Sequence, residues 1–270
     1  MSRTRLWIVL ALVSVLAGGL IAAGCGGDDD DEEEGAVPQS VSVGSDIPFP
    51  PFEQGKAPDY DGFDIELVRE IGDRAGFEVT VEDTSFDTIF RDLAQGKFDL
   101  VASATTITPE RERTVDFSDP YFFADQSLLG TKDGDVRSVD DLAGATVGVQ
   151  QGTTGQIYAE DETDAENVRG FPEFADATTA LQAGQVDAVI MDLPAAEDAV
   201  DAQPELEIVE ELVTREEYGM PVAEDNTALL DAVNEALQEV KDDGTYAEIY
   251  QKWFKEEPPE ELLDATHEPE

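Results

Sequence analysis

Histidine and cysteine are almost missing from this chain of 270 residues, which has one histidine, His267, and one cysteine, Cys25. Nucleophilic dyads and triads with a histidine base, and zinc or thiolate metal sites, need several such residues in one place. A single cysteine also forms no disulfide within the chain. The composition therefore argues against an enzyme that uses histidine chemistry, and it predicts no catalytic residue, no metal site and no cofactor.

Positive charge is also scarce, since six lysines and ten arginines stand against 63 acidic residues, for a net charge of −47. A surface this negative repels the phosphates of nucleic acids and anionic lipids, so we expect no nucleic-acid partner. The same self-repulsion weakens the compact state, and salt screens it. With 41% hydrophobic residues the chain is globular in composition. We interpret the acidity as adaptation to salt-rich surroundings; an ordinary acidic exported protein is the alternative.

The amino-terminal segment has the features of an export signal. Arg3 and Arg5 precede an apolar run over residues 6–21, and three small residues lead from it to Cys25. A charged start, a short apolar core and small residues mark a secretory signal, and the run is shorter than the ~20 residues of a spanning helix. We predict a signal peptide over 1–24, with an uncleaved anchor helix as the alternative. Both place the rest of the chain outside the cell.

Two acidic segments flank the part of the chain that we expect to fold. Seven consecutive acids occupy residues 28–34, and such a run repels itself and buries no apolar surface. We therefore predict a flexible tether over residues 25–40, in preference to a calcium site in the same run. Residues 258–270 are acidic again, and we predict a loose tail there.

The body of the chain alternates strand and helix patterns, which is typical of parallel sheets with crossover helices. The first series is predicted as a strand at 41–43, a helix at 63–75, a strand at 79–81, a helix at 87–95 and a strand at 99–102. The second is predicted as strand 146–149, helix 177–183, strand 186–191, helix 194–200 and strand 206–209. Two amphipathic helices, over 229–240 and after Gly244, complete an α/β fold of two units.

Six blocks of sequence, in order along the chain, resemble the bacterial extracellular solute-binding proteins of family 3, the polar amino-acid receptors of ABC importers. The resemblance covers about Val41 to Phe254. The blocks are Phe49-Pro50-Pro51-Phe52-Glu53, Gly62-Phe63-Asp64-Ile65-Glu66-Leu67 through Ile71-Gly72-Asp73-Arg74-Ala75, Ile107-Thr108-Pro109-Glu110-Arg111, Asp116-Phe117-Ser118, Gln151-Gly152-Thr153-Thr154 and Asp243-Gly244-Thr245-Tyr246.

The resemblance implies the two-lobed periplasmic-binding-protein fold of type II. Each lobe would be a mostly parallel sheet flanked by helices, and two strands would form the hinge between the lobes. We expect the first lobe at 41–129 plus 221–257 and the second at 130–220. Ligand would bind between the lobes and favour their closure, as a shift of population set by differential affinity.

The resemblance also places the two charged ends of an amino-acid ligand. Arg111 stands where relatives bind the carboxylate, and a guanidinium suits a carboxylate bidentately. Asp192, after the apolar strand 186–191, stands where relatives bind the ammonium, at a strand end where α/β sheets place ligand contacts. The structural alternatives are a surface ion pair of Arg111 with a neighbouring glutamate, and a helix cap formed by Asp192.

The other expected ligand contacts are polar groups and aromatic walls. We expect hydroxyl or backbone donors for the carboxylate from Thr106, Thr153 and Thr154, and carbonyl acceptors for the ammonium from Ser103 and Ala104. We expect aromatic walls for the ligand side chain from Phe49 and Phe86. Asp46 and Gln150 are expected as polar partners for the end of that side chain. Core packing is the alternative role for Phe86, and a turn cap is the alternative for Asp46. Phe52 is expected in the core.

The implied function is the substrate-binding component of an ABC importer, not an enzyme. Gln150 and Met191 differ from the residues of some glutamine-binding relatives, and nothing supplies a cation for a second ligand carboxylate. The first observation counts against strict glutamine specificity, and the second counts against glutamate and aspartate. The expected ligand is a polar amino acid such as glutamine, or a cationic one. The expected partner is a membrane permease, reached by a monomer tethered to the outer face of the cytoplasmic membrane by lipid on Cys25. A dehydratase of the cyclohexadienyl or arogenate type and a ligand-sensor domain are the alternatives.

The acidity leads to a first prediction, on stability in salt. Because counterions screen repulsion between exposed carboxylates, the melting temperature should rise by roughly 5 °C or more between 10 mM and 2 M NaCl. Differential scanning calorimetry at constant pH measures this, with 20% sucrose as a control that stabilises by exclusion and not by screening. A melting temperature that does not rise with salt would contradict the adaptation to salt.

Overall fold

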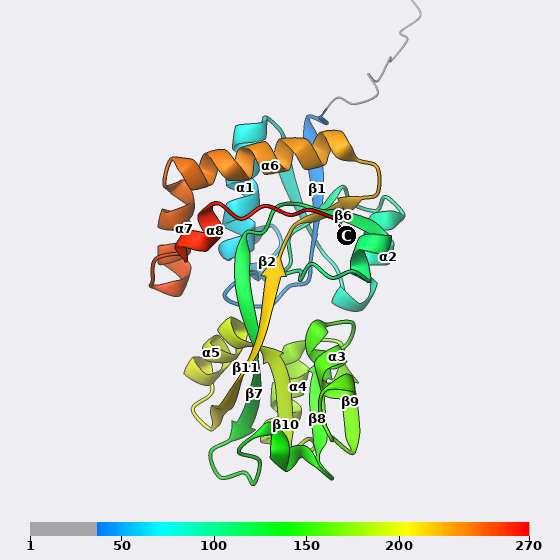
Figure 1. Cartoon of the computed structure of the whole chain (residues 1–270), viewed down its shortest axis with the longest axis vertical. Helices are drawn as coiled ribbons and strands as arrows, with labels where there is room; N and C mark the ends of the chain where they lie inside the picture. Colours follow the sequence, from blue (N-terminus) through cyan, green and yellow to red (C-terminus); the bar gives the residue numbers. More distant parts are fainter. Residues whose placement is uncertain (1–36, 270) are drawn as a thin grey trace, which may run out of the picture. The chain divides into compact units, whose positions relative to one another are not determined.

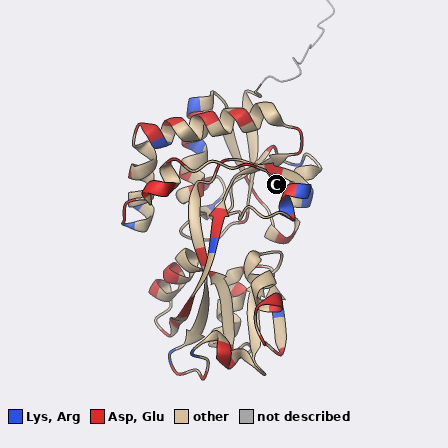
Figure 2. Ribbon diagram, in the orientation of Figure 1, with Lys and Arg blue, Asp and Glu red and all other residues tan. Residues whose placement is uncertain are grey.

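The computed structural model describes residues 37–269, which form two α/β lobes, each built on a five-stranded sheet (Figure 1). The predicted signal peptide, Cys25 and almost all of the predicted tether lie outside the described residues. Within residues 37–269, no helix is both long and apolar enough to cross a membrane. Acidic residues are spread over the helices and strands of both lobes, and basic residues are few (Figure 2).

The first sheet has the strand order β4-β1-β5-β12-β6. Its strands are β1 (Ser40–Ser45), β4 (Glu78–Asp83), β5 (Leu100–Val101), β6 (Val115–Phe117) and β12 (Pro221–Ala223). β1 lies parallel to β4 and β5, and β12 runs antiparallel to β5 and β6. The alternating Val41 and Val43 are fully buried, as the period of a strand predicts.

Helices cover this first sheet. They are α1 (Phe63–Ala75), α2 (Ile89–Ala94), α6 (Thr227–Asp242) and α7 (Thr245–Phe254), and a small hairpin of β2 (Gln54–Lys56) and β3 (Asp59–Asp61) precedes α1. α1 buries the apolar residues of its helical stripe, and α6 and α7 pack against it. The predicted helices at 63–75 and 229–240 are thus confirmed. The helix predicted at 87–95 is shorter, because a 3-10 turn, η1 (Phe86–Thr88), precedes α2.

The second sheet has the order β11-β7-β10-β8-β9. Its strands are β7 (Phe122–Thr131), β8 (Thr146–Gln150), β9 (Asn167–Phe171), β10 (Ala188–Asp192) and β11 (Leu206–Tyr218). β8 is parallel to β9 and β10, whereas β7 is antiparallel to β10 and β11. The elements η3 (Val139–Leu142), α3 (Thr154–Asp161), α4 (Phe174–Gln182) and α5 (Leu193–Ala202) complete this lobe.

β7 and β11 form a long antiparallel pair, and the two segments of chain that connect the two sheets lie at one end of this pair. One crossing, over residues 118–121, joins β6 to β7, and the other, over 219–220, joins β11 to β12. The amide of Ser118 donates to the carbonyl of Met220 at 3.0 Å, so the two crossings are bonded to each other. The strand predicted at 206–209 was too short. The predicted lobe boundaries at 129/130 and 220/221 stay predictions, although the second sheet already begins at Phe122.

Aromatic rings fill the junction between these strands and the first lobe. The ring of Phe52 lies 5.1 Å from that of Phe122 and 5.6 Å from that of Phe254, and Phe52 is fully buried, as expected for a core residue. Gly62, before α1, has φ +133 and ψ 171, a region that only glycine adopts readily. A Cβ there would lie 2.0 Å from the carbonyl oxygen of Phe52, so this close approach also requires glycine.

The prediction of a loose carboxyl-terminal tail was wrong. Residues Glu260–Leu263 form a short helix, α8, and the side chain of Leu262 is fully buried in the core of the first lobe. Leu263 and Ala265 pack against the same core. The acidic composition hid these apolar residues, whose burial outweighs the solvation of the acids around them.

Candidate functional site

A cavity lies between the two lobes, at the carboxyl ends of β1 and β5 in one sheet and of β8 and β10 in the other. Side chains from both lobes line it: Asp46, Phe49, Glu53, Phe86, Ser103, Ala104, Thr106, Arg111, Gln150, Thr153, Thr154, Phe174 and Asp192. All eleven predicted ligand contacts are among them, although they come from distant parts of the chain. Their roles in binding stay predictions.

Arg111 lies in a 3-10 turn, η2 (Arg111–Arg113), and its side chain is 9% exposed. Its Nη1 donates to the carbonyl of Thr106 at 2.7 Å, and its Nη2 donates across the cavity to the carbonyl of Gly152 at 3.1 Å. The guanidinium also lies over the ring of Phe90, with 4.6 Å between its Cζ and the ring centroid. Desolvation lowers the pKa of Arg111 to about 10, against the opposing effect of nearby acids. Arg111 therefore remains a cation at neutral pH, held in the site and not in a surface ion pair.

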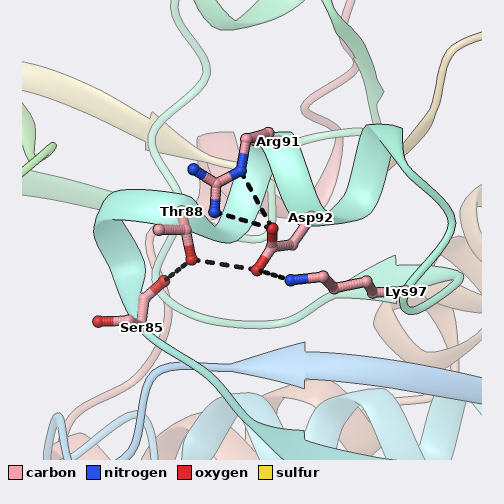
Figure 3. Close-up of polar contacts among 5 residues, drawn as sticks. All are labelled: Ser85, Thr88, Arg91, Asp92 and Lys97. Carbon is pink, nitrogen blue, oxygen red and sulfur yellow. Dashed lines mark hydrogen bonds and ion pairs between the residues drawn. The ribbon is translucent and has the colours of Figure 1, made fainter.

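The ring of Phe86 is the second aromatic contact of this guanidinium, with 5.4 Å between the Arg111 Cζ and the ring centroid, and Phe86 lines the cavity. The turn that carries Phe86 is held by Asp92, which is 4% exposed (Figure 3). Asp92 accepts from Thr88 at 3.1 Å and pairs with Lys97 at 2.7 Å and with Arg91 at 3.1 Å. The bond from Lys97 is the main cause of a lowered pKa of Asp92. This ion cluster thus fixes the start of α2 and one wall of the site.

Asp192 ends β10 and precedes α5, whose first turn contains Pro194. Its side chain makes no capping hydrogen bond to α5, so the alternative role as a helix cap is absent. One carboxylate oxygen instead accepts a short hydrogen bond from Gln126. Burial, and then the charge of Glu216, raise the pKa of Asp192 to about 8. This carboxylate is therefore poised to accept a cation.

Asp46 lies directly after β1 and bonds across the cavity. Its Oδ2 accepts from Nε2 of Gln150 at 2.6 Å, which joins the two lobes. Burial and the charge of Glu173 raise the pKa of Asp46 to about 7. The rings of Phe49 and Phe174 also meet between the lobes, stacked with 5.2 Å between their centroids. The structure therefore shows the lobes closed on each other.

Thr153 and Thr154 open α3 beside the cavity. Thr153 is the N-cap of α3, because its Oγ1 accepts from the amide of Gln156 at 3.2 Å, and it donates to the carbonyl of Gln150 at 2.9 Å. The hydroxyl expected to serve a ligand carboxylate is thus engaged in the helix start. The helix N-terminus itself still offers a favourable place for an anion.

Glu216, on β11, is a buried residue beside the cavity that the sequence did not indicate. Its Oε2 accepts from Thr106 of the first lobe at 2.7 Å and from Thr154 of the second at 2.8 Å, while its Oε1 accepts from Gln126 at 2.9 Å. One carboxylate on a crossing strand therefore bonds to both lobes at once. No local pattern in the acidic segment that contains it distinguishes this glutamate from its neighbours.

Glu53 and Phe174 also line the cavity, and the sequence did not indicate them. Glu53 is fully buried, accepts from Oγ of Ser103 at 3.0 Å, and its other oxygen has no hydrogen-bond partner among the described residues. Burial, and then the charge of Asp64, raise the pKa of Glu53 well above its usual value. Its place in the motif Phe49–Glu53 was the signal that could have found it.

Asp64, at the start of α1, supports the same wall of the site. It accepts from the amide of Ala104 and from the hydroxyl of Tyr121, each at 2.7 Å. Burial raises the pKa of Asp64 to about 7 against these two hydrogen bonds. Ala104 has a positive φ of 44, so Asp64 holds a strained stretch of backbone beside the cavity.

The charges of the site are strongly unequal. Five buried carboxyl groups, Asp46, Glu53, Asp64, Asp192 and Glu216, lie in or beside a cavity that contains one buried cation, Arg111. Buried carboxylates without a paired cation are costly, and burial raises the pKa values of Asp46, Glu53, Asp64 and Asp192. The site as it stands therefore favours an added positive charge and disfavours an added negative one.

The raised pKa values predict how stability depends on pH. Asp46, Asp64 and Asp192 keep protons in the folded protein that the unfolded chain loses near pH 4, so their contribution is full below that pH and is lost toward pH 7 to 8. Without ligand in 1 M NaCl, the melting temperature should fall by roughly 5 °C between pH 5 and pH 8. Asp192→Asn should flatten this fall, whereas Asp231→Asn, on the exposed face of α6, should not; equal slopes in all three proteins would contradict the prediction.

Comparison with known proteins agrees with the fold. The model of the bacterial extracellular solute-binding proteins, family 3, matches residues 41–256. "ABC transporter arginine-binding protein 1" of Escherichia coli (strain K12) is 32% identical over 80% of this chain and 91% of its own length. "ABC transporter glutamine-binding protein GlnH" of Bacillus subtilis (strain 168) is 35% identical over 74% of this chain and 75% of its own length.

A solved structure extends the likeness to three dimensions. The arginine-, lysine-, histidine-binding protein ArtJ from Geobacillus stearothermophilus superposes with a TM-score of 0.79 at 37% identity, covering 83% of this chain and 99% of that one. The fold is therefore that of the type II amino-acid-binding proteins, as predicted. The two relatives named above are amino-acid-binding proteins of ABC transporters. The chain belongs to the bacterial extracellular solute-binding proteins of family 3.

Proposed function

We propose that this protein is the extracellular receptor of an ABC importer and that it captures a cationic amino acid, such as arginine or lysine, between its lobes. The observation that carries the proposal is the buried acidic wall of the cavity, above all Glu53 with its unpartnered oxygen. The names of the relatives in Escherichia coli and Geobacillus stearothermophilus support a cationic ligand, and that of the Bacillus relative keeps glutamine as the competing one.

The two ends of the amino acid bind at opposite charges. The carboxylate pairs with Arg111, whose guanidinium is already oriented by Thr106 and by two aromatic rings. The ammonium replaces the proton held by Asp192. Charge-assisted hydrogen bonds of this kind contribute about 1.5–3 kcal/mol each, and a micromolar dissociation constant needs about 8 kcal/mol in total. The two ends alone therefore supply much of the affinity.

The side chain of the ligand decides the specificity. A guanidinium or ammonium at its far end meets Asp46 and Glu53 and neutralises them in a cavity that screens charge poorly. An amide such as that of glutamine satisfies their hydrogen bonds but leaves their charge unbalanced, so it binds only while they keep their protons. A second carboxylate on the ligand meets acids alone, which disfavours glutamate and aspartate.

Ligand and lobe closure stabilise each other. Asp46 with Gln150, and Arg111 with Gly152, already join the lobes, and a ligand with two charged ends adds contacts to both sides. Closure is then a shift of population, driven by contacts that only the closed form offers. The closed form presents one rigid surface to the permease, which is the partner we propose. We propose further that lipid on Cys25 holds a monomer at the outer face of the membrane.

The competing function is a dehydratase that uses a buried carboxylic acid as its proton donor. Asp192, with a pKa raised to about 8, has the protonation that such a reaction needs. A cationic wall opposite a cyclic acid is absent from the residues that line the cavity, where Arg111 is the one basic side chain. Turnover of prephenate or arogenate by the purified protein would overturn the receptor assignment.

Titration calorimetry with the purified protein in molar salt tests the receptor function. Arginine or lysine should bind with a micromolar or lower dissociation constant, and glutamate should not bind. Arg111→Ala should weaken binding at least about 100-fold, since two charge-assisted bonds are lost. Arg113→Ala, in the same turn but exposed, is the matched control and should change little. An unchanged affinity in Arg111→Ala, or no binding of any amino acid, would contradict the proposal.

Glu53→Gln separates the cationic ligand from glutamine. Removing this buried charge should weaken arginine or lysine about tenfold, while glutamine should bind as well as before or better. Glu110→Gln, an exposed acid near Arg111, is the matched control. If Glu53→Gln lowered the affinity for cationic and neutral amino acids equally, the specificity would not reside in the charge of Glu53.

A further inference from the structure

Residues 258–269 form a segment, here named the carboxyl-terminal strap, that lies beyond the family match, which ends at residue 256. In Figure 1 the strap is the red end of the chain, which runs across the first lobe from α8. Leu262 anchors it, because this side chain is fully buried in the first-lobe core. A buried leucine contributes about 1.5–3 kcal/mol, enough to hold a short segment in place. The strap is therefore a fixed part of the lobe.

The far end of the strap bonds to two separate segments through His267, the single histidine of the chain. Nε2 of His267 lies 2.9 Å from Oε1 of Glu112, and the two side chains are 11% and 12% exposed. The backbone amide of His267 donates to Oδ1 of Asp119 at 2.7 Å. One residue thus joins two points of the first lobe that are otherwise connected through the chain between them.

One of these points adjoins the residue proposed to bind the ligand carboxylate, and the other lies in a connection between the two sheets. Glu112 is the middle residue of the one-turn helix η2, and its neighbour Arg111 carries the guanidinium of the site. Asp119 lies in the first crossing between the sheets, and its amide donates to Oδ1 of Asn234 at 2.9 Å. Within the described residues, the hydrogen bonds of the η2 backbone lie inside segment 108–114, for example from the amide of Glu112 to the carbonyl of Thr108 at 3.0 Å. So short a turn is held weakly by itself.

We propose that the strap is a positioning element for ligand capture: His267, by binding Glu112 and Asp119 together, fixes the turn that presents Arg111 to the ligand carboxylate. His267 touches no ligand and acts through Glu112. This inference rests on the proposed function, because it assigns to the strap the orientation of the proposed carboxylate-binding residue. It adds an element outside the family match to the machinery of binding.

The test compares variants of the purified full-chain protein by titration calorimetry with arginine and lysine. His267→Ala should weaken binding about fivefold, and so should Glu112→Ala, since each removes the same bond. The double variant should lose no more than either single variant, because coupled residues are not additive. His267→Gln, which can still donate to Glu112, should restore most of the affinity. Glu268→Gln, an exposed neighbour in the strap, is the matched control.

Hydrogen exchange of the ligand-free protein gives the independent readout. Amides of residues 110–114 should exchange faster in His267→Ala than in the unaltered protein, while amides of α1 and α6 should not change. Unchanged exchange at 110–114 would overturn the proposal, and so would faster exchange without loss of affinity in a protein that binds amino acids. If the unaltered protein bound no amino acid, the proposed function would fail, and exchange at 110–114 would alone decide whether the strap orders the turn.

Discussion

The architecture of the site depends on keeping one guanidinium among several buried carboxyl groups. Arg111 is almost fully buried, and it stays charged because Glu216 and Asp192 lie near it. Asp192 in turn favours a cation, since burial, and then the charge of Glu216, raise its pKa to about 8. Contacts that look separate in the sequence therefore have one electrostatic cause. Several features position the Arg111 guanidinium: the aromatic rings beside it, the ion cluster of Asp92 that fixes one of these rings, and the strap.

Much of the fold followed from local pattern, because the first core elements bury one face with a clear period. β1 and α1 are examples, with alternating valines and a helical stripe of buried apolar residues. β11 was predicted too short, since only a few of its thirteen residues are buried and its length is set by pairing with β7. The ordered carboxyl-terminal strap was not predicted, because the burial of Leu262 depends on a surface that distant residues build. The acidic composition of the strap indicates a solvated segment, and it does not show that one leucine in the segment is buried.

The candidate site divides in the same way. The place of Arg111 was predictable because it ends one of the sequence blocks that resemble a known family, and that of Asp192 because it directly follows the apolar strand predicted at 186–191. Glu216 was not, because its role comes from bonds to Thr106 and Thr154, which are 110 and 62 residues away. Glu53 lies inside the block Phe49–Glu53, but the block does not show that this glutamate is fully buried. Its burial depends on the start of α1, which packs against Phe52. Long-range burial gives an ordinary residue type its function, and no short pattern carries that information.

The acidity of the surface and the acidity of the site then have different consequences. A net charge of −47 attracts cations over long distances and accelerates their arrival in dilute buffer. In molar salt the screening length falls to about 3 Å, so this long-range attraction contributes little there. Pairs inside the closed cavity, such as Asp46 with a ligand cation, are screened far less. At high salt, selectivity therefore depends on buried charges, and the carboxyl groups around Arg111 are buried.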